Sequence, residues 1–94
     1  MGRFIEYCLV DKKALLIARY RPSFKKMQEE LSERVTAYAG PRVATLCAAM
    51  HAHATVHPRE DTAPLSPLIE LAAQPPQVVE AINAVTIHLW DCYP

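Results

Sequence analysis

Histidine and cysteine residues recur at helical spacing in the middle of the 94-residue chain. His53 and His57 are four residues apart, as are Cys47 and His51. On a helix such a pair shares one face, and this is how a helix presents two ligands to a zinc ion. A complete site needs at least three protein ligands, and the sequence does not show which pairs converge. A metal-binding helical module that uses His53 and His57 is therefore an alternative prediction.

A second candidate site is the basic stretch RYRPSFKK, in which cations alternate with Tyr20 and Phe24. Its cations are Arg19, Arg21, Lys25 and Lys26. Basic residues beside aromatic rings can follow a phosphate backbone and stack a base, and a helix N-terminus offers N–H groups to an anion. The cluster predicts, as another alternative, a nucleic-acid or phosphate-binding protein. Against it, the net charge is zero and no helix-turn-helix signature follows.

The sequence matches none of the catalytic motifs that we considered. The sequence has no glycine-rich phosphate loop, no GxSxG and no HExxH. Cys47 could pair with a histidine, but a thiol on an apolar helix is poorly activated as a nucleophile. We therefore expect no enzymatic activity and no cofactor.

The elements that must position these residues are organised around 42–57, RVATLCAAMHAHATVH, the most continuous apolar run. Gly40 and Pro41 precede it and Pro58 follows it, which predicts a helix with a defined start and end. One side gathers side chains that can fill a core: Val43, Leu46, Cys47, Met50 and Ala54. Another side is a small-residue face that lets a second backbone approach closely: Ala44, Ala48 and Ala52. Almost no solvated face remains, so we expect burial on nearly every side, completed by a partner helix.

Further helices are predicted on both sides of this one. Residues 24–39 follow Ser23 as N-cap and have one apolar face: Phe24, Met27, Leu31, Val35 and Tyr38. A short helix is predicted to begin at Ser66-Pro67 and to end before Pro75. The last helix is predicted over residues 77–90. Its apolar side chains have the spacing of a seam between two packed helices: Val78, Ile82, Val85 and Leu89. Trp90 follows directly, and tryptophan is a frequent interface anchor.

Residues 3–20 fit two interpretations. FIEYCLV is rich in strand formers, and Asp11-Lys12-Lys13 could turn a hairpin into ALLIARY. The turn lacks Gly or Asn and neither arm alternates, so we favour a helix broken near Asp11. The predicted fold class is all-α: one domain over 1–94, a bundle of four or five helices around the central apolar helix. The alternative is an α+β fold with an N-terminal β-hairpin at residues 4–20.

Composition and charge limit the class of protein. No apolar run approaches the roughly 20 residues that span a bilayer, and the start lacks a signal-peptide pattern. Three widely spaced cysteines without CxxC are typical of a reducing compartment, so we expect a cytoplasmic protein without a membrane partner. Residues 1–42 hold nine Lys/Arg and five Asp/Glu, a net charge of +4; residues 43–94 hold one and five, a net charge of −4. The two halves should attract each other, within one molecule or between two, or the first half should attract an anion.

The leading prediction for function is a small non-enzymatic protein-interaction module. We expect a regulator or inhibitor that binds a surface of a larger protein partner of unknown identity and self-associates as a homodimer. The predicted interaction surface combines the small-residue face, the seam and the aromatic anchor: Ala44, Ala48, Ala52, Val78, Ile82, Val85, Leu89 and Trp90.

Overall fold

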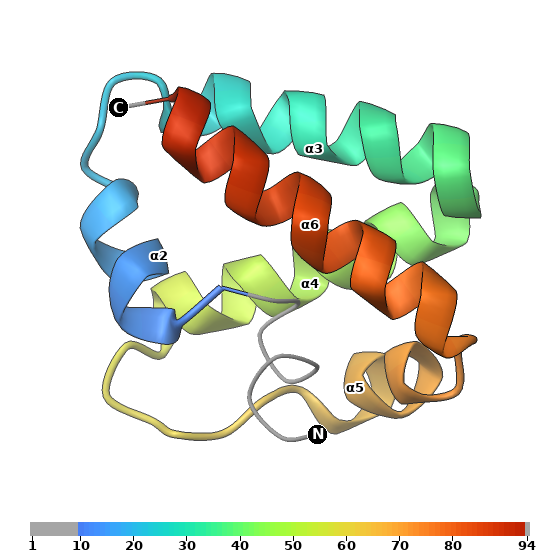
Figure 1. Cartoon of the computed structure of the whole chain (residues 1–94). Coiled ribbons are helices and arrows are strands. Elements are labelled where there is room, and N and C mark those ends of the chain that lie inside the picture. Colours follow the sequence, from blue (N-terminus) through green and yellow to red (C-terminus); the bar gives the residue numbers. More distant parts are fainter. Residues whose placement is uncertain (1–9, 94) are drawn as a thin grey trace.

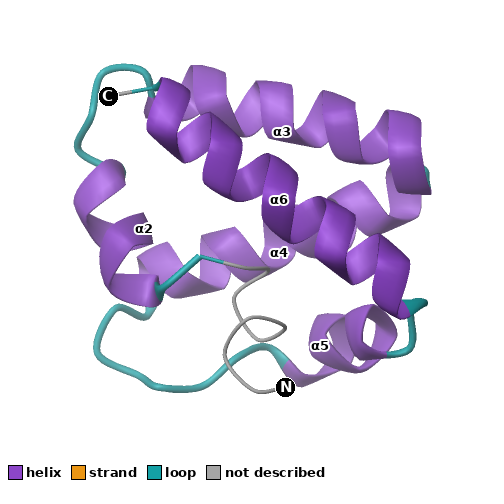
Figure 2. Ribbon diagram, viewed as in Figure 1, coloured by secondary structure: helices purple, strands orange, loops and turns teal. Residues whose placement is uncertain are grey.

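Residues 10–93, which are the residues that the computed structural model describes, form five α-helices without a strand (Figures 1 and 2). In chain order the helices are α2 (Lys12–Ala18), α3 (Phe24–Ala39), α4 (Pro41–Val56), α5 (Leu65–Ala72) and α6 (Pro76–Cys92). The predicted all-α class is confirmed. None of these helices is long and apolar enough to cross a bilayer.

The tight connection between α3 and α4 is made by Gly40. Its N–H donates to the carbonyl of Thr36 at 2.9 Å, which closes α3, and Pro41 opens α4. The φ of Gly40 is +94° and its ψ is 164°, a backbone conformation with positive φ that only glycine adopts readily. The predicted break is confirmed, and α4 runs back from it toward α2 while α3 runs the opposite way above it (Figure 1).

The main core lies between α3, α4 and α6. The predicted core face of α4 is buried throughout, and Met50 at its centre is 0% exposed. Met27, Leu31 and Val35 of α3 are buried in the same cluster. Tyr38 was expected to join them and is instead 57% exposed. It stands in the last turn of α3, where it borders a shallow pocket against α6 with its phenol ring largely in solvent.

The first described helix, α2, packs on the far end of α4. Asp11 caps it by accepting a hydrogen bond from the N–H of Lys13 at 3.2 Å. Leu15 of α2 and Ala54 of α4 are both 0% exposed and contact each other in a small second core cluster. The hairpin alternative is not supported, because most of its second arm lies in α2. Its first arm spans residues 4–10, of which 4–9 lie outside the described residues.

Within one molecule, one stripe of α4 is left unburied, and the expected burial of this stripe by a partner helix stays a prediction. The helices α2, α3 and α5 pack against α4. Ala48, Ala52 and Val56 are exposed, and Val56 is 69% exposed. Apolar composition alone did not show that these neighbours leave a side of α4 open.

The last two helices match their predicted places with shifted ends. The helix α5 begins at Leu65, so Ser66 lies inside the first turn rather than at the N-cap. The helix α6 begins at Pro76 and continues to Cys92, slightly beyond the predicted 77–90. Proline is tolerated in a first turn because the N–H that it lacks has no partner within the helix.

Candidate functional site

A groove of about 280 Å³ lies between α3 and α4. The wall from α3 consists of Phe24, Gln28, Leu31, Ser32 and Val35. The wall from α4 consists of Ala44, Cys47, Ala48, His51, Ala52 and Thr55.

The small-residue face predicted on α4 lines this groove. Ala44 is 5% exposed and is covered by its neighbours, whereas Ala48 and Ala52 are open to solvent. The three alanines are four residues apart, so their methyl groups follow one line along the helix. A surface of this kind sets almost no steric limit on how closely a second helix backbone can approach.

Among the described residues, the lining of the groove contains no Lys, Arg, Asp or Glu. It is largely apolar and has polar side chains at Gln28, Ser32, His51 and Thr55. Lys25 and Glu29 of α3 are exposed, but they do not line the groove.

The seam predicted on α6 lies in the core of the monomer. Ile82 and Leu89 are 3% and 1% exposed, and Val78 and Val85 pack against the same cluster. Trp90 is partly buried, and its ring meets the ring of Phe24 edge-on with the ring centres 6.0 Å apart. The seam spacing thus matches packing between α6 and α3 of the same chain, and Ile82 and Leu89 offer no surface to a partner.

The basic cluster is divided between two roles. Nη1 of Arg19 donates to the carbonyl of Thr55 at 2.9 Å, and the guanidinium lies 4.7 Å from the centre of the Tyr20 ring. Nη1 of Arg21 donates to the carbonyl of Tyr93 at 3.2 Å. Both arginines thereby join distant segments of the fold. Lys25 and Lys26, in the first turn of α3, are exposed.

The two predicted metal ligands do lie together on α4 and the residue after it. The rings of His53 and His57 are 4.7 Å apart and inclined by 35°. Nδ1 of His57 is 3.4 Å from Oε1 of Glu60. Within residues 10–93, however, no group of three or more His, Cys, Asp or Glu side chains is arranged to hold a metal ion. The described part of the chain therefore does not supply the ligand set that the metal alternative needs.

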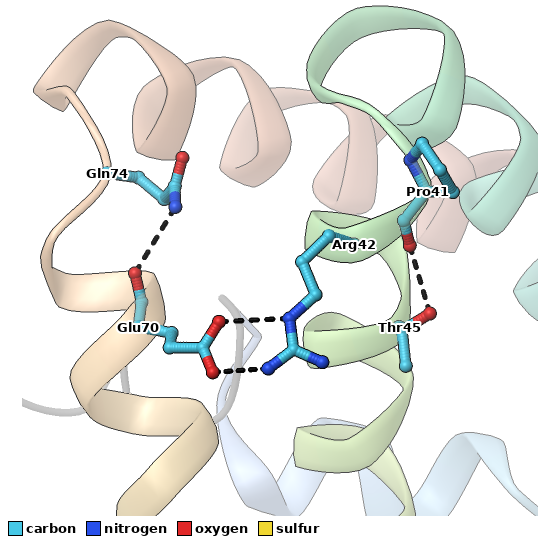
Figure 3. Close-up of polar contacts among 5 residues, drawn as sticks. All are labelled: Pro41, Arg42, Thr45, Glu70 and Gln74. Carbon is cyan, nitrogen blue, oxygen red and sulfur yellow. Dashed lines mark hydrogen bonds and ion pairs between the residues drawn. The ribbon is translucent and has the colours of Figure 1, made fainter.

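Sequence reasoning missed an ion pair beside the entrance to α4. Nε of Arg42 donates to Oε2 of Glu70 at 3.0 Å, and Nη2 donates to the other carboxylate oxygen (Figure 3). These hydrogen bonds lower the pKa of Glu70 and raise that of Arg42. Arg42 belongs to the basic half of the sequence and Glu70 to the acidic half, so the halves attract within one molecule at this point. Charge segregation was the only sequence signal for it.

Taken together, the groove offers largely apolar contact along its walls and close backbone approach at Ala48 and Ala52. These are the features by which a protein surface receives an amphipathic helix. No protein-family model, curated protein or solved structure matches the chain.

Proposed function

We propose that this chain is a small non-enzymatic protein-interaction module that binds a helix of a larger protein partner in the groove between α3 and α4. It would act as a regulator or inhibitor by occupying that helix. The observation that carries the proposal is the open stripe of Ala48 and Ala52 beside a groove of about 280 Å³. A largely apolar lining, with exposed alanines along the α4 wall, suits a helix that presents apolar side chains every three or four residues.

The proposal includes a reducing, cytoplasmic setting. Cys47 is a buried free thiol and Cys92 an exposed free thiol. An exposed thiol is prone to oxidation and intermolecular pairing outside a reducing compartment. Fractionation of the source cells with an antibody to the chain tests this, and recovery in an extracellular fraction would contradict it.

The proposed binding face can be tested by site-specific photo-crosslinking in the native cells. A benzophenone amino acid replaces Ala52 in one variant and Ala84 in the other. Both positions are exposed alanines inside a helix, but Ala84 is on α6 and does not line the groove. We expect Ala52 to give a crosslink to one amphipathic helical peptide of a single protein, and Ala84 to give none. Equal crosslinking from both positions, or none from Ala52, would refute the proposal.

Once the crosslinked partner is identified, substitutions in this chain can be tested for their effect on its binding affinity. Ala52→Arg places a long cationic side chain on the α4 wall of the groove, whereas Ala84→Arg makes the same change on α6, outside the groove. Both sites are solvent-exposed and arginine is a good helix former, so both variants should fold. We expect Ala52→Arg to weaken binding about tenfold or more, as loss of a central contact does, and Ala84→Arg to leave it unchanged.

A further inference from the structure

A thiol and an imidazole lie together on an exposed face of α6. Sγ of Cys92 is 3.6 Å from Nε2 of His88, which is within hydrogen-bond distance for a sulfur atom. Both residues are exposed, and the thiol of Cys92 is free. Because they are four residues apart, the helix itself holds the sulfur and the nitrogen on one face. A nucleophile within hydrogen-bond distance of a base is the arrangement that activates a thiol.

A carboxylate of α3 supports this pair. The pKa of Glu30 is lowered, chiefly by the hydrogen bond from Tyr93 and, as a smaller cause, by the charge of His88. The same attraction favours a positively charged imidazole at His88, which is the state that forms when Nε2 takes a proton from the thiol. Arg34 shares the charge of Glu30, since their side chains are 3.3 Å apart. Cys92, His88 and Glu30 thus bring together a nucleophile, a base and a carboxylate.

The second cysteine among residues 10–93 has a different environment. Cys47 is 4% exposed and belongs to the main core cluster. A dissolved reagent therefore reaches its sulfur poorly, whereas the sulfur of Cys92 is open to solvent. The chain thus carries a buried thiol that serves as an internal reference for the exposed one.

We propose that Cys92 is a site of reversible disulfide formation with low-molecular-weight disulfides and that His88 acts as its base. Nε2 of His88 takes the proton from Sγ of Cys92, and this sulfur attacks one sulfur of the small disulfide. A bond forms between these two sulfurs, the bond within the small disulfide breaks, and the leaving sulfur takes the proton as a free thiol. Cys92 is oxidised and the leaving sulfur is reduced, so the exchange needs no further oxidant.

The test is the rate at which the full chain forms a mixed disulfide with bis(2-hydroxyethyl) disulfide. Peptide mass spectrometry identifies the modified cysteine, and we expect Cys92 to react well before Cys47. His88→Gln should slow the reaction at Cys92 about tenfold near neutral pH, less than a general base contributes in an enclosed site. His57→Gln is the matched control, because it makes the same change at another exposed histidine and should leave the rate unchanged. Glutamine is a good helix former, so His88→Gln should keep its fold.

A pH series separates the role of a base from a structural role. In alkaline solution the thiol ionises without help, so the rates of the unchanged chain and of His88→Gln should converge. The charged and titratable groups beside the pair are Glu30 and Arg34 of α3 and Tyr93 after α6. The series stays below pH 10.0, because the pKa of Tyr93 is raised above that value by its bond to Glu30 and the hydroxyl then keeps its proton. The reagent is uncharged, so the surface charge of a variant does not change its approach.

Glu30→Gln examines the carboxylate. A glutamine oxygen can still accept the hydrogen bond from Tyr93, so this variant removes the charge and keeps the contact. We expect it to slow the reaction near neutral pH by a smaller factor than His88→Gln, and the difference should also vanish in alkaline solution.

Three results would overturn the inference. They are an adduct on Cys8 or Cys47 without one on Cys92, equal rates for His88→Gln and the unchanged chain, and a rate difference that is the same at every pH. Dithiothreitol should remove the adduct and restore the original mass, and a product that resists it would not be a disulfide. The inference does not rest on the proposed function, since neither His88 nor Cys92 lines the groove.

Discussion

The hydroxyl of Tyr93 donates a hydrogen bond to a carboxylate oxygen of Glu30, so the residue that ends α6 is tied to the first half of α3. The carbonyl of Tyr93 accepts from Arg21 at the entrance to α3. The hydrogen bond from Tyr93 lowers the pKa of Glu30 below 4.5, and the same bond raises the pKa of Tyr93 above 10.0. The hydroxyl and the backbone carbonyl of this one residue thus hold the C-terminal end of the described chain against two other segments.

This bond should make folding stability depend on pH at both ends of the scale. Because the pKa of Glu30 is lowered on folding, its contribution to folding stability is present above pH 4.5 and is lost as the pH falls through the lowered pKa. Because the pKa of Tyr93 is raised on folding, its contribution to folding stability is present below pH 10.0 and is lost as the pH rises through the raised pKa. We expect the stability difference between the unchanged chain and Tyr93→Phe to be constant between these limits and to shrink beyond each.

Thermal melts of the two proteins from about pH 2 to about pH 11 measure that difference. The pair formed by Arg42 and Glu70 also titrates in acid, but it is present in both proteins and cancels. Parallel curves for the two proteins across the whole range would show that the Tyr93 hydroxyl contributes nothing in solution.

Gly40 should tolerate a D-residue far better than an L-residue. A Cβ at this position meets no atom within 4 Å, so the cost of Gly40→Ala comes from the backbone at φ +94° alone. We expect an L-alanine to lower the free energy of unfolding by about 1–3 kcal/mol. D-alanine, introduced by chemical synthesis, prefers positive φ and should leave stability near that of glycine. Urea unfolding measures both, and equal losses would mean that the side chain clashes after all.

Met50 should be among the most costly positions to truncate. Its side chain is 0% exposed inside the main cluster, so Met50→Ala leaves a cavity and should cost about 2–5 kcal/mol. Val56→Ala, on the same helix at 69% exposure, should stay within about 0.5 kcal/mol. Urea unfolding of both variants compares them directly, and similar losses would contradict the assignment of the core to this side of α4.

Periodicity predicted the helices and much of the core because it depends on local sequence. The steps of three and four in residues 24–39 found Met27, Leu31 and Val35, and the same reasoning found the buried face of α4. Tyr38 fits the period equally well and is exposed. Its burial depends on how far α6 extends over the last turn of α3, which local spacing does not determine.

The candidate site was harder to predict, for a related reason. Alanines at four-residue spacing identified a surface that a second helix can approach closely. The sequence did not show how the other helices would be arranged around α4, and this arrangement decides that Ala48 and Ala52 are exposed. The spacing of Ile82 and Leu89 identified a packed seam, but a seam within one chain and a seam between two chains have the same spacing. The acceptors of Arg19 and Arg21 are backbone carbonyls 36 and 72 residues away, which no local pattern marks.

Arg19 should therefore behave as a residue of the fold rather than of an anion site. Arg19→Ala removes the bond to the carbonyl of Thr55 and should cost about 1–2 kcal/mol in urea unfolding. Lys26→Ala, from the same basic cluster but fully available to solvent, should change stability by less than about 0.5 kcal/mol. A nucleic-acid interface would give a different result. Arg19→Ala would then leave stability intact, and it would weaken retention on a polyanion column as strongly as Lys26→Ala does, since each would remove one phosphate contact.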